Sequence, residues 1–162
     1  MSSETLDYAI ADGVATITLN RPQVMNALDA GMIRQLRVVC ELARDDESVR
    51  AIVLCGNGPA FLAGGDVALF HANLPKLPEM VLDLAGELHH AIVALREAAK
   101  PVLASVHGAV AGAGVSLLAA ADLAIAAAET KFTLAYSKIA TSPDGGSSYF
   151  LPRIVGTRKA LE

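Results

Sequence analysis

Aromatic residues are scarce in this chain. Tryptophan is absent, and aromatic residues make up 4% of the 162 residues. Proteins that bind single-stranded nucleic acid stack bases on such rings, and nucleic-acid-binding surfaces are rich in lysine and arginine. A formal net charge of -4 provides no such basic excess. We therefore expect no nucleic-acid partner.

Long apolar runs are also missing. A membrane-spanning helix needs roughly 18 or more consecutive apolar residues. The nearest stretch, Val102–Ala121, is interrupted by glycines and by His107. The N-terminal residues MSSETLDYAI contain neither the basic nor the apolar segment of a secretory signal peptide. We expect no membrane partner and a cytoplasmic location.

Cysteine is limited to two isolated residues, Cys40 and Cys55. A disulfide framework needs more cysteines and an oxidising compartment, so reduced core thiols are the favoured interpretation. His89, His90 and His107 show no metal-ligand spacing with one another or with the cysteines. We interpret them as structural histidines and expect no metal site.

Apolar residues, by contrast, are abundant. They make up 53% of the chain and charged residues 19%, which excludes a disordered protein. The length suits one domain, residues 1–162, with a substantial core. The apolar fraction exceeds what a small soluble domain needs. It predicts subunit contacts, or a covering segment of chain that is absent here.

Strand patterns alternate with helix patterns, which predicts an α/β fold with βαβ-type crossovers. The Asp12-Gly13 pair predicts a hairpin between the first two strands. Short strands are predicted at Leu6–Ile10, Val14–Leu19, Ala51–Cys55, Val102–Val106 and Leu123–Ala127, with an extended piece at Lys131–Leu134. Helices are predicted from a cap at Asp29 to about Arg44, from Asp66 to about Phe70, at Glu79–Ala98 with Val81 facing inward, and at Ser147–Leu151. The Pro75–Pro78 segment is predicted to be a linker or mobile loop.

Two glycine turns precede helical stretches, one at Ala63-Gly64-Gly65 and one at Gly112-Ala113-Gly114. The second follows a buried strand and opens a helix that is apolar on nearly every face, so that helix should lie inside the protein. Backbone N–H groups of both turns that converge on one oxygen would form an oxyanion hole. Neither turn continues into the lysine motif of a phosphate-binding loop. From spacing alone, close helix–sheet packing is the favoured interpretation.

Asp144 and Asp66 are the carboxylates that the sequence singles out. Asp144 lies between Pro143 and Gly145-Gly146, where an aspartate commonly caps the following helix. Its alternative role is that of a general base at the edge of an apolar cavity. Asp66 offers the same two interpretations, and capping is favoured there.

Several motifs together resemble the crotonase (enoyl-CoA hydratase/isomerase) superfamily. They are Ile17–Pro22 followed by Met25–Leu28, the turn Ala60–Asp66, and Lys100–Val102 leading through Gly108 to Gly114 and Asp122. The resemblance runs from about Leu6 to Glu162. It implies a crotonase-like spiral of ββα units with the C-terminal helical region largely absent. It also implies an acyl-CoA substrate, and a homo-oligomer, either a trimer or a hexamer.

The resemblance reverses the preference for packing at the glycine turns. It implies that the N–H groups of Gly65 and Ala113 hold the thioester oxygen as it becomes an enolate. It places Met25 to Leu28, Ala27 among them, and the backbone of Ala63, Gly64 and Asp66 where the family receives coenzyme A. Gly112 and Tyr136 complete the substrate-binding residues that we predict. No cofactor is implied beyond the coenzyme A of the substrate.

The reaction depends on where the chain departs from the family. The family's hydratases use two glutamates, and the matching positions here are Ser116 and Tyr136. Asp144 lies where the family's enoyl-CoA isomerases have their single acid, so the resemblance favours an isomerase with Asp144 as acid and base.

Three alternatives remain open. One is hydration through an unrecognised second acid. A second is a 4-chlorobenzoyl-CoA dehalogenase-like enzyme, whose histidine and tryptophan align with His89 and Tyr136. The third is a non-catalytic CoA-binding or assembly module, if the chain is naturally this short.

Overall fold

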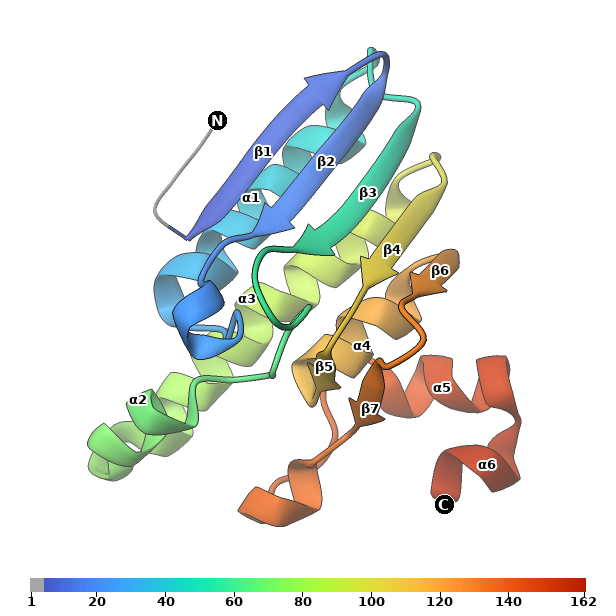
Figure 1. Ribbon diagram of the computed structural model, residues 1–162. Coiled ribbons are helices and arrows are strands. Elements are labelled where there is room, and N and C mark those ends of the chain that lie inside the picture. Colours follow the sequence, from blue (N-terminus) through green and yellow to red (C-terminus); the bar gives the residue numbers. More distant parts are fainter. Residues whose placement is uncertain (1–4) are drawn as a thin grey trace.

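Repeated strand–strand–helix units build the protein. The computed structural model describes residues 5–162. A five-stranded sheet has the order β1-β2-β3-β4-β6, and a two-stranded sheet pairs β5 with β7 (Figure 1). The strands are β1 (Leu6–Ala11), β2 (Val14–Leu19), β3 (Ala51–Gly56), β4 (Val102–Val106), β5 (Ala109–Ala111), β6 (Leu123–Ala126) and β7 (Lys131–Thr133).

The hairpin predicted at Asp12-Gly13 is confirmed. Both residues have positive φ angles, 52° and 78°, as tight hairpin turns require. Strands β1 and β2 are antiparallel, whereas β2–β3, β3–β4 and β4–β6 are parallel. This parallel, helix-crossed sheet is the α/β architecture that the sequence predicts.

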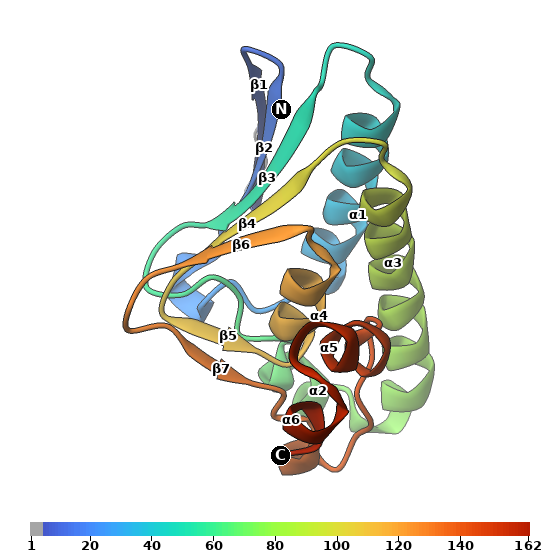
Figure 2. The same ribbon diagram turned by 90° about the vertical axis from the view of Figure 1, so that its right-hand side faces the viewer.

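Two long helices, α1 and α3, cover one face of the large sheet (Figure 2). Their buried side chains, which include Leu36 and Leu95, meet those of β2, β3 and β4 in one apolar core. The α-helices are α1 (Ala30–Asp45), α2 (Val67–Ala72), α3 (Leu77–Glu97), α4 (Ala113–Ala120), α5 (Ser147–Val155) and α6 (Thr157–Leu161), and the 3-10 helices are η1 (Pro22–Val24), η2 (Leu74–Lys76) and η3 (Tyr136–Ile139).

The Pro75–Pro78 linker prediction is wrong. These residues form η2 and the first turn of α3. Proline fits the first turn of a helix because its missing N–H would have no partner there. Helix α3 therefore begins two residues before the predicted start, and Val81 on it is half-buried rather than fully inside.

Helix α4 is buried as its composition predicts. All of its residues except Leu118 are buried, and it follows the second glycine turn directly. Strand β6 behaves differently, because all four of its residues are exposed, with Leu123 at 63% and Ile125 at 62%. Within residues 5–162, no helix combines the length and the apolar composition needed to cross a membrane.

Candidate active site

The first glycine turn lies alongside the segment after β2. The Ala63 N–H donates to the Met25 carbonyl at 3.0 Å, and the Leu28 N–H donates to the Gly64 carbonyl at 2.7 Å. The Asp66 N–H then donates to the Leu28 carbonyl at 3.0 Å. The structure therefore brings together two segments, residues 25–28 and 63–66, that the sequence assigns to substrate binding from places far apart in the chain.

Asn26 holds this turn in place, a role that its position in the Met25–Leu28 motif did not predict. Its side chain is fully buried, and its amide nitrogen lies 2.9 Å from the Asn57 carbonyl, 2.8 Å from that of Ala60 and 3.1 Å from that of Phe61. Its Oδ1 accepts the Arg21 N–H at 2.7 Å. An asparagine in a polar loop is common in any sequence, so only the fold reveals these contacts.

Arg21 is a second residue that sequence reasoning missed. Its guanidinium pairs with the carboxylates of Asp29 at 3.2 Å and Asp66 at 3.3 Å, and it also donates to the Ala27 carbonyl. The other oxygen of Asp66 accepts the Leu69 N–H at 3.1 Å, which confirms the predicted cap of α2. Both carboxylate oxygens of Asp66 are therefore engaged within the protein.

The second glycine turn packs directly against the first. The Ala111 N–H donates to the Leu62 carbonyl, and the Gly112 N–H donates to the Thr133 carbonyl, both at 2.9 Å. Gly112 has φ 51° and ψ -120°, a backbone conformation that only glycine adopts readily. A Cβ on Gly114 would lie 2.4 Å from the Leu62 carbonyl oxygen. Close packing, favoured from spacing alone, is real at this position.

The same packing leaves two backbone donors available. Across residues 5–162, neither the Gly65 N–H nor the Ala113 N–H is hydrogen-bonded to another protein group. Ala113 begins α4, where the first N–H groups of a helix have no partner within the helix. The predicted oxyanion donors therefore lie on two turns that touch, and both N–H groups remain unpaired donors among the described residues.

Asp144 lies close to this second turn. Ser116 is one turn beyond Ala113 on α4, and residues three apart share a helix face. The Ser116 hydroxyl donates to the Asp144 backbone carbonyl at 2.9 Å. Asp144 itself is half-buried.

The capping interpretation of Asp144 is wrong. Gly146, not Asp144, is the N-cap of α5. The Asp144 carboxylate instead accepts a hydrogen bond from the Tyr136 hydroxyl, with Oδ1 at 2.6 Å. Burial, followed by this hydrogen bond to Asp144, raises the pKa of Tyr136, so its hydroxyl stays protonated. The two positions that the resemblance matches to the hydratases' glutamates thus both contact Asp144: Tyr136 contacts its carboxylate, and Ser116 contacts its backbone carbonyl.

His89 approaches the same loop from α3. Its Nε2 accepts the Gly145 N–H at 3.1 Å, which supports the interpretation of a structural histidine. Among the described residues, no group of three or more His, Cys, Asp or Glu side chains is placed to bind a metal ion.

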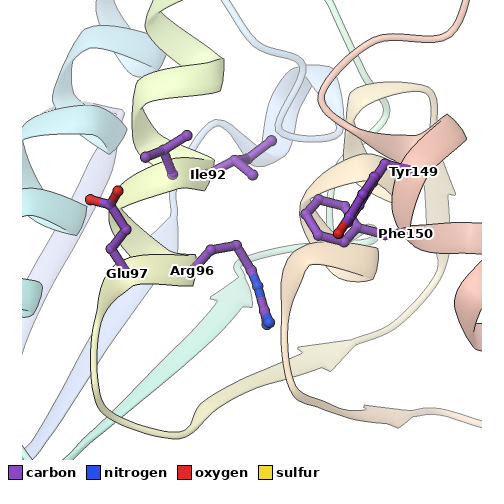
Figure 3. A pocket seen from close by; sticks show the side chains of 6 residues that line it. Ile92, Arg96, Glu97, Tyr149 and Phe150 are labelled. Atoms are coloured by element: carbon purple, nitrogen blue, oxygen red, sulfur yellow. The ribbon is translucent and has the colours of Figure 1, made fainter.

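A surface pocket of about 370 Å³ opens between α3 and α5. Figure 3 shows Arg96 on one wall, with Tyr149 and Phe150 on the other. Neither of the predicted oxyanion donors lines it, and nor does Asp144. This pocket is therefore separate from the candidate active site.

A family model and several known proteins match this chain over most of its length. The family model "Enoyl-CoA hydratase/isomerase" matches residues 9–162. A Rhodobacter capsulatus protein named "Probable enoyl-CoA hydratase" is 43% identical over 99% of this chain and 61% of its own length. A trans-2-decenoyl-acyl-carrier-protein isomerase of Streptococcus mutans is 32% identical over 100% of the chain and 62% of its own length.

A solved structure agrees in fold. The crystal structure of an enoyl-CoA hydratase from Polaromonas sp. JS666 superposes with a TM-score of 0.90 at 34% identity, covering 98% of this chain and 62% of that one. The chain thus spans about three fifths of the length of the relatives it matches. Named relatives include hydratases, isomerases and dehalogenases. On the match over residues 9–162, this chain belongs to the enoyl-CoA hydratase/isomerase family.

Proposed function

We propose that the chain is an acyl-CoA-processing enzyme that moves a double bond, as an enoyl-CoA isomerase does. The observation that carries the proposal is the surroundings of Asp144. Its carboxylate is contacted by a hydroxyl, and the second family acid position, Ser116, also holds a hydroxyl. One carboxylate suffices for a proton shift, whereas classical hydration uses a pair.

One carboxylate and two backbone N–H groups account for each step of the proposed reaction. Asp144 removes a proton from C2 of a 3-enoyl thioester, and the electron pair moves toward the thioester oxygen. The N–H groups of Gly65 and Ala113 stabilise the resulting dienolate, and losing one such donor typically costs about 3 kcal/mol. The protonated Asp144 then returns the proton to C4, which leaves the conjugated 2-enoyl thioester and restores the carboxylate.

We assign substrate binding to residues 25–28 and to the first glycine turn, residues 63–66, which lies alongside them. Met25, Ala27, Ala63 and Gly64 are the residues proposed to line the coenzyme A site, and Gly112 shapes the turn beside the thioester. No cofactor is proposed other than the coenzyme A of the substrate. A trimeric or hexameric homo-oligomer remains a prediction, which light scattering of the purified chain would check. A cytoplasmic location also remains a prediction.

The test is conversion of a 3-enoyl-CoA into the conjugated 2-enoyl-CoA, followed by its ultraviolet absorbance. Wild type should form product, and Asp144→Asn should slow the reaction about 10²- to 10⁴-fold because the base is lost. Asp83→Asn is the matched control, since Asp83 is an exposed aspartate on α3 that pairs with Arg34. No product from wild type, or an undiminished rate in Asp144→Asn, contradicts the proposal.

Hydration is the second candidate, because the 43% identical relative carries a hydratase name. It predicts that a 2-enoyl-CoA incubated in ¹⁸O-labelled water gains one labelled hydroxyl at C3. Isomerisation incorporates no solvent oxygen, so mass spectrometry of the product separates the two reactions.

A further inference from the structure

Three hydroxyl groups contact Asp144 from inside the protein: that of Ser147, three residues along the same segment, and those of Ser116 and Tyr136 from other elements. Ser116, on α4, is fully buried, and Tyr136, at the start of η3, is 9% exposed. We call these two residues the hydroxyl pair. The Tyr136 oxygen lies 2.6 Å from Asp144 Oδ1, and the Ser116 oxygen lies 2.9 Å from the Asp144 backbone carbonyl oxygen.

A count of protons fixes the direction of these bonds. Each hydroxyl has one proton to donate. The backbone carbonyl of Asp144 can only accept, so Ser116 uses its proton there. An ionised carboxylate can also only accept, so Tyr136 uses its proton on Oδ1. The Ser116–Tyr136 oxygen contact at 3.2 Å is then a close approach without a shared proton.

The loop that carries Asp144 packs directly against Ser116, one member of the hydroxyl pair. A Cβ on Gly145 would lie 2.6 Å from the Ser116 Cβ. Position 116 is therefore covered by this loop, and a side chain as long as glutamate would displace it. Neither hydroxyl of the pair has a proton left for a substrate while both hold Asp144.

We propose that Ser116 and Tyr136 are positioning residues that fix Asp144 so that Oδ2 is the oxygen exchanging protons with the substrate. Ser116 sets the backbone position of Asp144, and Tyr136 sets the orientation of its carboxylate. Within residues 5–162, Oδ2 has no hydrogen-bond partner, so it is the free oxygen. The inference rests on the proposed isomerase function, since one fixed oxygen must serve both C2 and C4. It replaces the substrate-binding role predicted for Tyr136.

The kinetic test compares Tyr136→Phe and Ser116→Ala with wild type on a 3-enoyl-CoA. Misplacing a catalytic group costs rate rather than binding, so kcat should fall about 10- to 100-fold while KM stays within about twofold. Tyr149→Phe is the matched control, because it removes a hydroxyl from a tyrosine that is 56% exposed. An unchanged kcat in Tyr136→Phe, or a rise in KM alone, overturns the proposal.

A second measurement does not depend on turnover. Hydrogen–deuterium exchange of the peptide covering residues 141–146 should be faster in Tyr136→Phe and in Ser116→Ala than in wild type or Tyr149→Phe. Exchange that matches wild type in both variants overturns the positioning role of the hydroxyl pair. Faster exchange in the variants of a chain whose wild type forms no 2-enoyl product supports that role and contradicts the isomerase proposal instead.

Discussion

The two sides of the candidate site are built in different ways. On the proposed oxyanion side, the candidate groups are backbone N–H donors, and Gly112 adopts a conformation that other residues rarely adopt. On the proposed acid side, the candidate group is the Asp144 side chain, and the side chains of Ser116, Tyr136 and His89 hold its loop. The oxyanion side should therefore be sensitive to backbone changes, and the acid side to the removal of single hydroxyl groups.

The largest effect is expected at Asn26, which supports the oxyanion side from a distance. Asn26→Ala leaves the carbonyls of Ala60 and Phe61 without their buried donor. We expect a loss of about 4 kcal/mol in the free energy of unfolding, because each buried unsatisfied group costs roughly 1–3 kcal/mol. Urea denaturation measures it.

Asn57→Ala is the control for that substitution, since the Asn57 side chain makes an exposed hydrogen bond to Asn20. We expect it to change stability by less than about 0.5 kcal/mol. Equal losses in the two variants would show that the buried amide does not fasten the turn.

A smaller effect is expected at Gly112. Nothing lies closer than 3.6 Å to a Cβ built there, so Gly112→Ala meets a conformational cost and not a clash. We expect a loss of about 1–3 kcal/mol in unfolding free energy, together with slower turnover as the Ala113 N–H shifts.

At Gly86, the same glycine-to-alanine change should have the opposite effect on stability. It lies within α3, and nothing lies within 4 Å of a Cβ built on it. Gly86→Ala should therefore stabilise the chain by about 0.5–1 kcal/mol. If Gly112→Ala is equally stabilising, the positive-φ conformation of Gly112 does not strain an alanine at this position.

The smallest effect concerns Tyr136 and alkaline pH. Burial raises the pKa of Tyr136 in the folded chain, so the folded state keeps the proton that the unfolded chain releases near pH ~10. The stability that this adds is complete below that pH and is lost as the pH rises toward the folded pKa. Chemical denaturation above pH ~9 should show a shallower loss with pH in Tyr136→Phe than in wild type. Identical slopes of unfolding free energy against pH in wild type and Tyr136→Phe would contradict this prediction.

Much of the fold could be predicted from local patterns. The Asp12-Gly13 hairpin, the Asp29 cap of α1 and the buried helix α4 follow from turn chemistry, capping and hydrophobic patterning. The error at Pro75–Pro78 arose because proline signals both a loop and the first turn of a helix. Strand β5 was also missed, since three residues between two glycines give too short a pattern.

The sequence by itself determined the α/β class and the family, and it indicated the candidate site residues, because glycine turns and an aspartate beside two glycines are local features. The tertiary structure alone decided how they are combined. It placed Gly64 against Gly112, gave Asn26 and Arg21 their anchoring roles, and turned the Tyr136 hydroxyl onto Asp144. The contacts of Asn26 and Arg21 join segments dozens of residues apart and depend on the path of the whole chain, so no local pattern contains them. Tyr136 and Asp144 are eight residues apart, and their contact depends on how the irregular chain between them turns.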